Sequence, residues 1–255
     1  MATFPKGCAL IFGGSGGIGS GVARTFAESS CDVALVYRSN PESAEAAASH
    51  ARRAGRMATT HCADVTDPAQ VQSAVEAAIA AHGRIHTVIW GAGPLVNQHY
   101  IAETPLEQWR HALDVEATGF FTAATAIIPQ MREAGGGSFV HLGSAGHDWW
   151  PARDGLSVAA KAPNEALVKG IAKEEGKNLI RANSVLVGVI DAGQLHKLTE
   201  LGQLDAGWVA ETHKLLAIKR WGSPEEIGHA CAYFASNEAA YVTGQTITVS
   251  GGFGV

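Results

Sequence analysis

A run of glycines near the start of the chain has the composition of a loop that holds a diphosphate. It reads Gly13-Gly14-Ser15-Gly16-Gly17-Ile18-Gly19 and lies between a short apolar segment and a stretch with helical character. Glycines let the backbone turn tightly and approach a pyrophosphate, whose charge then lies at the N-terminus of the following helix. The run fits two glycine spacings, and its strand-turn-helix setting favours dinucleotide binding over a merely structural turn. We expect cofactor contacts at Gly13, Ser15, Gly17, Ile18 and Gly19.

The residues after the second apolar segment indicate which dinucleotide is bound. Arg38 and Ser39 stand where an NAD site usually carries an acid for the ribose 2′-hydroxyl. A guanidinium beside a hydroxyl suits a 2′-phosphate, which favours NADP(H), unless Arg38 is only a solvated charge at the end of a strand. Asp64 and Val65 follow the third segment, where an adenine would lie. Asp64 either accepts from the adenine amino group or caps the helix that begins near Pro68.

Short apolar segments alternate with longer alanine-rich helical patterns along the chain. Seven of them have the character of strands: residues 8–12, 33–37, 57–62, 85–90, 138–142, 180–186 and 246–249. Near-continuous apolar strands separated by helices predict a parallel sheet covered on both faces. We therefore expect one α/β domain over residues 1–255, a Rossmann-type doubly wound sheet of about seven strands.

Composition and charge narrow the class of partner. The 255 residues carry a formal net charge of −5 and contain no run of lysine and arginine, which argues against nucleic acid or an anionic membrane as partner. No apolar run approaches membrane-spanning length, and the N-terminal residues lack the pattern of a signal peptide. A cytoplasmic protein that binds a small-molecule substrate is expected.

Cysteine and histidine give no indication of a metal site. The four cysteines form no Cys-x-x-Cys pair, and three of them lie in or beside apolar segments. This predicts buried free thiols and a reducing compartment. The eleven histidines are scattered and form no compact ligand set with acids.

Further segments, in the same order along the chain, resemble the short-chain dehydrogenase/reductase family in its single-domain form. Gly91-Ala92-Gly93 is similar to the Asn-Ala-Gly segment after the fourth strand, with Gly91 in place of the asparagine. Residues 187–191 resemble the Pro-Gly turn after the sixth strand, and residues 220–227 and 243–252 resemble two C-terminal segments. The resemblance implies a nicotinamide dinucleotide with contacts at Gly91, Ala92, Gly93, Gly188 and Ile190.

The family transfers hydride with an Asn-Ser-Tyr-Lys tetrad, and two of these residue types are present here. Ser144 takes the serine position, and Lys161 takes the lysine position, which in the family holds the nicotinamide ribose. Ser157 stands at the tyrosine position, and its hydroxyl is too weak an acid and too short to replace a phenol as proton donor. It either holds a water or is only a small helix residue. Glu116 stands at the asparagine position and is expected to pair with Lys161, unless burial keeps it protonated.

The position of Asp154 along the expected helix makes it another candidate proton donor. Asp154, Ser157 and Lys161 are spaced at i, i+3 and i+7, which places them on one helical stripe. Asp154 also heads the helix, so it is either a proton donor or the N-cap.

The loop after Ser144 offers further candidates, because in the family this loop lines the substrate pocket. His147 is either a group that titrates near neutrality or a solvated loop residue. Trp149 and Trp150 would form an apolar wall that receives a ring. His99 and Tyr100 are expected near the rim of the same pocket.

Together these residues predict an NADP(H)-dependent oxidoreductase that acts on a small cyclic or aromatic carbonyl, imine or enone with a proton source other than tyrosine. Two alternatives stay open: a non-redox acid-base enzyme, dehydratase or lyase-like, and a catalytically silent family member that binds cofactor. The resemblance also implies a variable substrate lid at about 191–220. It further implies homotetramers or dimers built on long helices at about 105–133 and 155–176.

Overall fold

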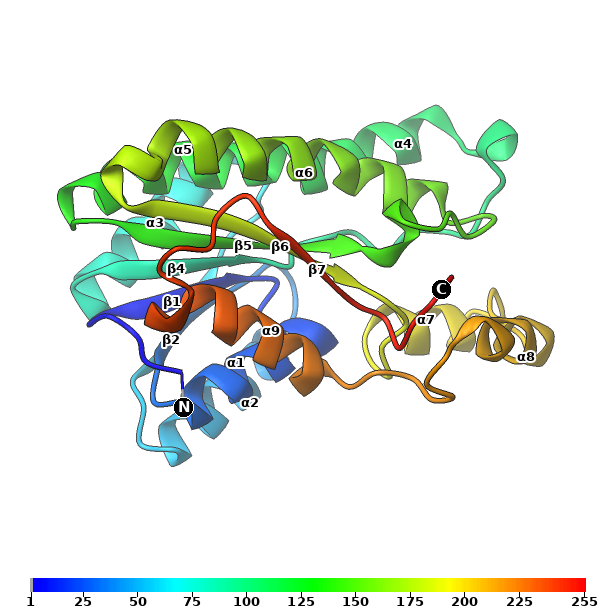
Figure 1. Ribbon diagram of the computed structural model, residues 1–255, viewed down its shortest axis with the longest axis horizontal. Coiled ribbons are helices and arrows are strands. Elements are labelled where there is room, and N and C mark those ends of the chain that lie inside the picture. The colour runs from blue at the N-terminus through cyan, green and yellow to red at the C-terminus, as the bar shows by residue number, and fades with distance from the viewer. Residues whose placement is uncertain (1) are drawn as a thin grey trace.

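The computed structural model describes residues 2–255, and within them seven strands form one sheet (Figure 1). The strands are β1 (Cys8–Phe12), β2 (Asp32–Tyr37), β3 (Ala58–Cys62), β4 (Ile85–Trp90), β5 (Gly137–Ser144), β6 (Ile180–Val187) and β7 (Thr246–Val249). Their order is β3-β2-β1-β4-β5-β6-β7, and every neighbouring pair is parallel. The predicted doubly wound α/β sheet is confirmed.

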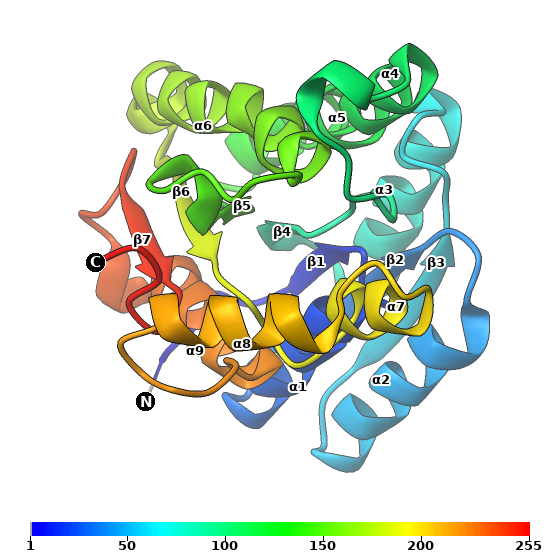
Figure 2. The ribbon, with the colours of Figure 1, turned by 90° about the vertical axis from the view of Figure 1, so that its right-hand side faces the viewer.

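Helices cover both faces of the sheet (Figures 1 and 2). One face carries α3 (Pro68–His82), α4 (Leu106–Leu113), α5 (Gly119–Glu133) and α6 (Gly155–Glu175), and the other carries α1 (Gly17–Glu28), α2 (Pro41–Arg53) and α9 (Pro224–Ala235). Two short helices, α7 (Gln194–Glu200) and α8 (Ala206–Leu215), lie at the carboxyl ends of the strands, within the expected lid. Among the residues described, no helix is both long and apolar enough to cross a membrane.

The central strand divides its side chains between two apolar cores, because successive strand residues face opposite sides of a sheet. Leu10 and Phe12 belong to the core with α3, α5 and α6, whereas Ala9 and Ile11 belong to the core with α1, α2 and α9. The order of the strands reverses between β1 and β4. In open α/β sheets the crevice beside such a reversal, at the carboxyl ends of the strands, is the usual ligand site.

Polar caps fix where two of these helices begin. Ser223 and Glu226 form a capping box at the start of α9. Asp67 caps α3 by accepting from two backbone N–H groups of its first turn. The alternative that Asp64 caps this helix is therefore wrong.

The region expected as one long helix, residues 105–133, contains an irregular turn. Helices α4 and α5 are joined by a π-helical turn, Asp114–Thr118, which holds Glu116. Turns of this kind are rare and frequently lie at functional sites. The extra residue rotates the following helix face, and the apolar pattern of the sequence does not reveal it.

Candidate active site

A cavity of about 600 Å³ opens at the carboxyl ends of the central strands. Its lining brings together residues that are far apart in the sequence: Gly13, Gly16–Gly19, Gly91–Gly93, Glu116, Ser144, Asp154, Ser157, Lys161, Gly188 and Ile190. Side chains of α7 and α8 line its outer side. Most of the predicted site residues therefore surround one space large enough for small-molecule ligands.

The glycine loop leaves no room for side chains at its tightest points. Gly13 has a φ of +78°, and a Cβ on it would clash with the carbonyl oxygen of Gly91. A Cβ on Gly17 would lie 2.5 Å from the backbone nitrogen of Gly193. Helix α1 begins at Gly17 with no side-chain cap and no acid in its first turn, which leaves its N–H groups for an anion. This backbone fits the diphosphate of a dinucleotide.

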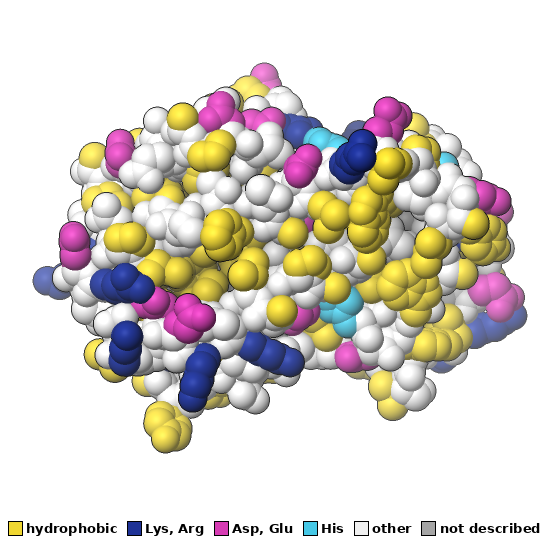
Figure 3. All heavy atoms as spheres, turned by 90° about the horizontal axis from the view of Figure 1, so that it is seen from above, with side chains coloured by type: hydrophobic (Ala, Val, Ile, Leu, Met, Phe, Trp, Pro, Cys, Tyr) yellow, Lys and Arg dark blue, Asp and Glu magenta, His cyan; other side chains and the backbone are white. Residues whose placement is uncertain are grey.

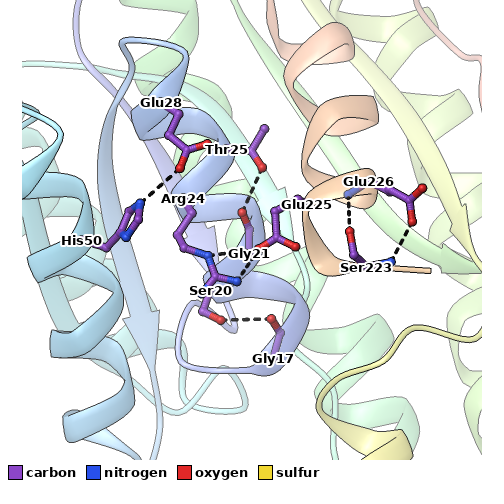
Figure 4. Close-up of polar contacts among 10 residues, drawn as sticks. All are labelled: Gly17, Ser20, Gly21, Arg24, Thr25, Glu28, His50, Ser223, Glu225 and Glu226. Carbon is purple, nitrogen blue, oxygen red and sulfur yellow. Dashed lines mark hydrogen bonds and ion pairs between the residues drawn. The ribbon is translucent and has the colours of Figure 1, made fainter. Parts of the chain in front are cut away.

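Helix α1, which follows this loop, is fastened to α9 (Figure 4). Arg24 on α1 forms an ion pair with Glu225 on α9, and a Cβ on Gly21 would clash with the first residue of α9. The Ser20 hydroxyl donates to the carbonyl oxygen of Gly17 over 3.0 Å. These contacts hold the N-terminal end of α1 in a fixed position beside the sheet.

Arg38 and Ser39 lie outside the lining of the cavity and are exposed at the end of β2. Within residues 2–255, the Arg38 guanidinium enters no ion pair. Asp64 accepts from the hydroxyl of Thr66 at 2.7 Å and from its N–H at 2.9 Å. These hydrogen bonds, and then the charge of Arg38, hold the pKa of Asp64 below its usual range. The contacts predicted for Arg38, Asp64 and Val65 with a cofactor stay predictions.

Lys161 and Glu116 form a buried ion pair at the floor of the cavity. The ammonium of Lys161 donates to Oε1 of Glu116, and the side chains are only 14% and 3% exposed. Gly93 makes room for the carboxylate, since a Cβ there would clash with the same oxygen. The predicted pairing is confirmed. Most of the Lys161 charge is therefore balanced by Glu116 and acts weakly on other groups.

Behind this pair lies a chain of buried polar groups that sequence reasoning missed. The Nδ2 atom of Asn164 donates to the carbonyl oxygen of Glu116 over 3.0 Å and lies 3.3 Å from Nε2 of His141. The Nδ1 atom of His141 lies 2.9 Å from a carboxylate oxygen of Glu165. Asn164 and His141 are fully buried. The only signal of this chain in the sequence was a histidine within the apolar strand β5. Buried hydrogen bonds of this kind fix the position of the π turn against α6.

The two candidate serines both line the cavity. Ser144 ends β5 and is 9% exposed, and its hydroxyl accepts from the N–H of Gly146 over 3.1 Å. Ser157 lies in the first turn of α6, where its N–H donates to the carbonyl oxygen of Asp154. The structure thus brings Ser144, Ser157 and Lys161 to the lining of one cavity.

Asp154 faces the cavity. It occupies the N-cap position of α6, as one of the two alternatives predicted, but its side chain makes no capping hydrogen bond and the carboxylate lines the cavity instead. Its Oδ1 accepts from Nε2 of Gln98 over 3.2 Å. Burial raises the pKa of Asp154 to about 6, opposed by the Gln98 hydrogen bond and by the charge of Lys161. Asp154 can therefore change its protonation state near neutral pH inside the cavity.

The other polar candidates lie outside the lining. His147 is half-buried, and its Nε2 donates to the carbonyl oxygen of Val158 over 2.9 Å. The backbone of His99 pairs with that of Asp154, while Tyr100 is exposed. His147 is therefore engaged in holding its loop on α6, which makes Asp154 the better placed titrating group.

Aromatic and aliphatic side chains form the outer wall of the cavity. They come from the loop after β5, from α7 and α8 and from the C-terminus: Trp149, Trp150, Leu195, Leu198, Leu204, Trp208, Leu215 and Phe253. The rings of Trp149 and Phe253 lie 5.3 Å apart. The hydroxyl of Thr248 donates to Asp148 over 2.9 Å, which ties the loop to β7. The wall expected from Trp149 and Trp150 is thus present and extends to Phe253.

Within residues 2–255, no three His, Cys, Asp or Glu side chains come together as a metal site. His82 and His86 are four residues apart, but one ends α3 and the other lies in β4. All four cysteines are free thiols, three of them buried and Cys62 exposed.

Comparison with known proteins identifies relatives over almost the whole chain. Residues 13–254 match the family model described as enoyl-(acyl carrier protein) reductase. A 3-oxoacyl-[acyl-carrier-protein] reductase of Chlamydia muridarum is 30% identical over 246 residues, which cover 96% of each chain. A short-chain type dehydrogenase/reductase from Mycobacterium ulcerans is 28% identical, with a TM-score of 0.90 over 98% of this chain and 90% of that one. A 7α-hydroxysteroid dehydrogenase, solved with NADH and 7-oxo glycochenodeoxycholic acid, is 25% identical, with a TM-score of 0.88 over 98% and 95% of the two chains.

Proposed function

Because the chain belongs to the short-chain dehydrogenase/reductase family, we propose that it is an NADP(H)-dependent oxidoreductase with a proton source other than tyrosine. Its substrate is a small cyclic or aromatic carbonyl, imine or enone. One observation carries the proposal. A single cavity joins the glycine loop to Ser144 and Lys161 and ends at an aromatic wall.

The cofactor would be held along the inner side of the cavity. The N–H groups at the start of α1 would bind its diphosphate, Gly91–Gly93, Gly188 and Ile190 would line its path, and Lys161 would hold the nicotinamide ribose. A nicotinamide dinucleotide supplies or accepts a hydride when it is bound. Arg38 and Ser39 supply the preference for the 2′-phosphate, because both residues are exposed just after β2 and the guanidinium enters no ion pair within residues 2–255.

The proposal includes three further properties. The proton comes from Asp154, from water held at Ser157 or from the substrate itself. Copies of the chain associate as dimers or tetramers through the face that carries α5 and α6. The protein works in the cytoplasm, where buried free thiols such as Cys8 and Cys231 stay reduced.

Titration of NADPH and NADH, followed by nucleotide fluorescence, tests the proposed cofactor. We expect NADPH to bind more tightly, and Arg38→Asp to weaken NADPH by about 1–3 kcal/mol, the value of a charge-assisted contact, with little change for NADH. Arg53→Asp, which removes an exposed arginine on α2, is the matched control and keeps the preference. Equal binding of NADPH by the Arg38→Asp variant excludes Arg38 from the site, and binding of neither nucleotide overturns the proposed function.

A further inference from the structure

The lining of the cavity has more negatively charged side chains than positively charged ones. Its lining contains three carboxylates, Glu116, Asp154 and Glu211, and one cation, Lys161. Glu116 forms an ion pair with Lys161, and the exposed Glu211 forms one with Lys214 over 2.6 Å. Asp154 is left with the neutral Gln98 amide, and within residues 2–255 it enters no ion pair. The cavity therefore contains a carboxylate that forms no ion pair with any side chain of the described residues.

The groups around Asp154 do not supply the missing cation. Lys161 on α6 is engaged with Glu116, and Arg153 donates to the carbonyl oxygen of Gln98, not to the carboxylate. His99 meets Asp154 through its backbone, and Glu211 on α8 adds negative charge. A carboxylate in such surroundings is stabilised by a cation that enters from solution.

The aromatic wall of the cavity is suited to the same kind of ligand. Trp149, Trp150 and Trp208 line the cavity, and the two loop tryptophans are 41% and 46% exposed. Indole faces attract cations that are weakly hydrated and spread over a ring. The lining thus combines a carboxylate with several indoles, and its one cationic side chain is paired. This combination favours an organic cation over a neutral ligand or an anion.

The residue at the tyrosine position suits a cationic substrate as well. Hydride addition to a ketone forms an alkoxide that must take up a proton, and Ser157 cannot donate one at neutral pH. Hydride addition to an iminium forms one C–H bond, and the C=N π pair becomes a lone pair on nitrogen. The two electrons come from the reduced nicotinamide of the proposed function, which is oxidised in the step. The product is a neutral amine, so no proton is consumed at the reacting atoms.

We propose that the cavity binds a cyclic iminium ion, with Asp154 as the counter-ion of its nitrogen and the tryptophans against its ring. The inference rests on the proposed function for the hydride and narrows the substrate of the same site. Asp154 acts here as an anion, whereas a role as proton donor would require its acid form.

Calorimetric titration of the cofactor-free chain with 2-methyl-3,4-dihydroisoquinolinium tests the binding step, because this ring carries a fixed charge. The neutral ketone 1-tetralone has the same fused rings and serves as the comparison. We expect the cation to bind at least tenfold more tightly than the ketone. Asp154→Asn should remove this difference, and Glu133→Gln, which removes an exposed carboxylate at the end of α5, should keep it.

The pH dependence separates the two roles of Asp154. The probe has no titrating proton, so its affinity should fall as the pH is lowered from 7.5 to 5, because Asp154 becomes protonated, and should be flat in Asp154→Asn. With NADPH present, turnover of the probe should follow the same profile. Equal binding of 1-tetralone, unchanged cation affinity in Asp154→Asn, or a rise at low pH would each overturn the proposal. Absence of NADPH binding would instead remove the proposed function, while the cation titration still reports on the pocket.

Discussion

The carboxylate of Asp154 lies where its charge costs free energy of folding. Burial raises its pKa from 3.8 to about 6, so the folded chain holds this proton more tightly than the unfolded chain does. The free energy of unfolding is therefore highest, as far as this group is concerned, below pH 3.8, where Asp154 is protonated in both states. It decreases as the pH rises through 6, where the buried carboxyl must ionise. Residues retained at such a cost are frequently functional.

Asp154→Asn should consequently stabilise the protein at pH 7.5 by about 2 kcal/mol, since each unit of pKa shift corresponds to 1.36 kcal/mol and relaxation removes part of it. The gain should be smaller at pH 4.5. Urea unfolding at both pH values measures the difference, with Glu133→Gln as the control that changes little at either. A loss of stability at pH 7.5 would show that the carboxylate holds the fold together, contrary to the role inferred for it.

Single residues were predictable where a pattern fixes them and not where packing does. The Lys161–Glu116 pair follows from the positions that the family resemblance gives to both residues, and the structure confirms it. The contact of Asn164 with the backbone of Glu116 depends on the exact rotation of α6 against the π turn. No local pattern encodes that rotation, so the chain from Glu116 to Glu165 emerged only from the fold.

At the scale of elements, helices α4 and α5 present apolar side chains to solvent. Leu106 on α4 is 59% exposed and Phe121 on α5 is 55% exposed. Figure 3 shows this face from above, where hydrophobic side chains lie among scattered charges. Helix faces with more apolar surface than their own sheet can cover are typical of contacts between subunits.

Phe121→Glu should therefore shift a dimer or tetramer towards smaller species, because a charge would be buried in the interface. Sedimentation velocity at micromolar concentration gives the distribution. Met57→Glu places the same charge at another exposed apolar position, before β3, and should leave the assembly unchanged. A wild-type chain that sediments as a monomer would make α5 ordinary surface.

The elements themselves were largely predictable. Each strand lies within two residues of the position that its apolar run indicates, because central strands covered on both faces must be apolar throughout. The π turn at Asp114–Thr118 was not predictable, since helical periodicity continues across it with only a local offset. The offset matters for function because it directs Glu116 towards α6.

At the scale of the whole molecule, the cavity is built from both ends of the chain. Gly13 lies in the first turn after β1, and Phe253 lies two residues from the C-terminus. The parallel sheet brings the carboxyl ends of all its strands to one edge, which is why the glycine loop, Ser144 and Lys161 could be placed together in advance. The contact between the rings of Phe253 and Trp149 depends on the path of the final segment across the sheet, and the sequence did not predict it.

The proposed site reduces its substrate without a phenol, and Ser157→Tyr tests this property. The balanced charge of Lys161 leaves a new phenol without the free cation that would lower its pKa. We expect reduction of cyclohexanone and 1-tetralone, followed by NADPH absorbance, to stay at background in Ser157→Tyr and to rise only in Ser157→Tyr/Glu116→Asn. Reduction of 2-methyl-3,4-dihydroisoquinolinium should fall in the single variant, because the new ring occupies substrate space. If the single variant reduces the ketones as fast as the double variant, the site does use a phenol when one is present and the proposed role of the Lys161–Glu116 pair is wrong.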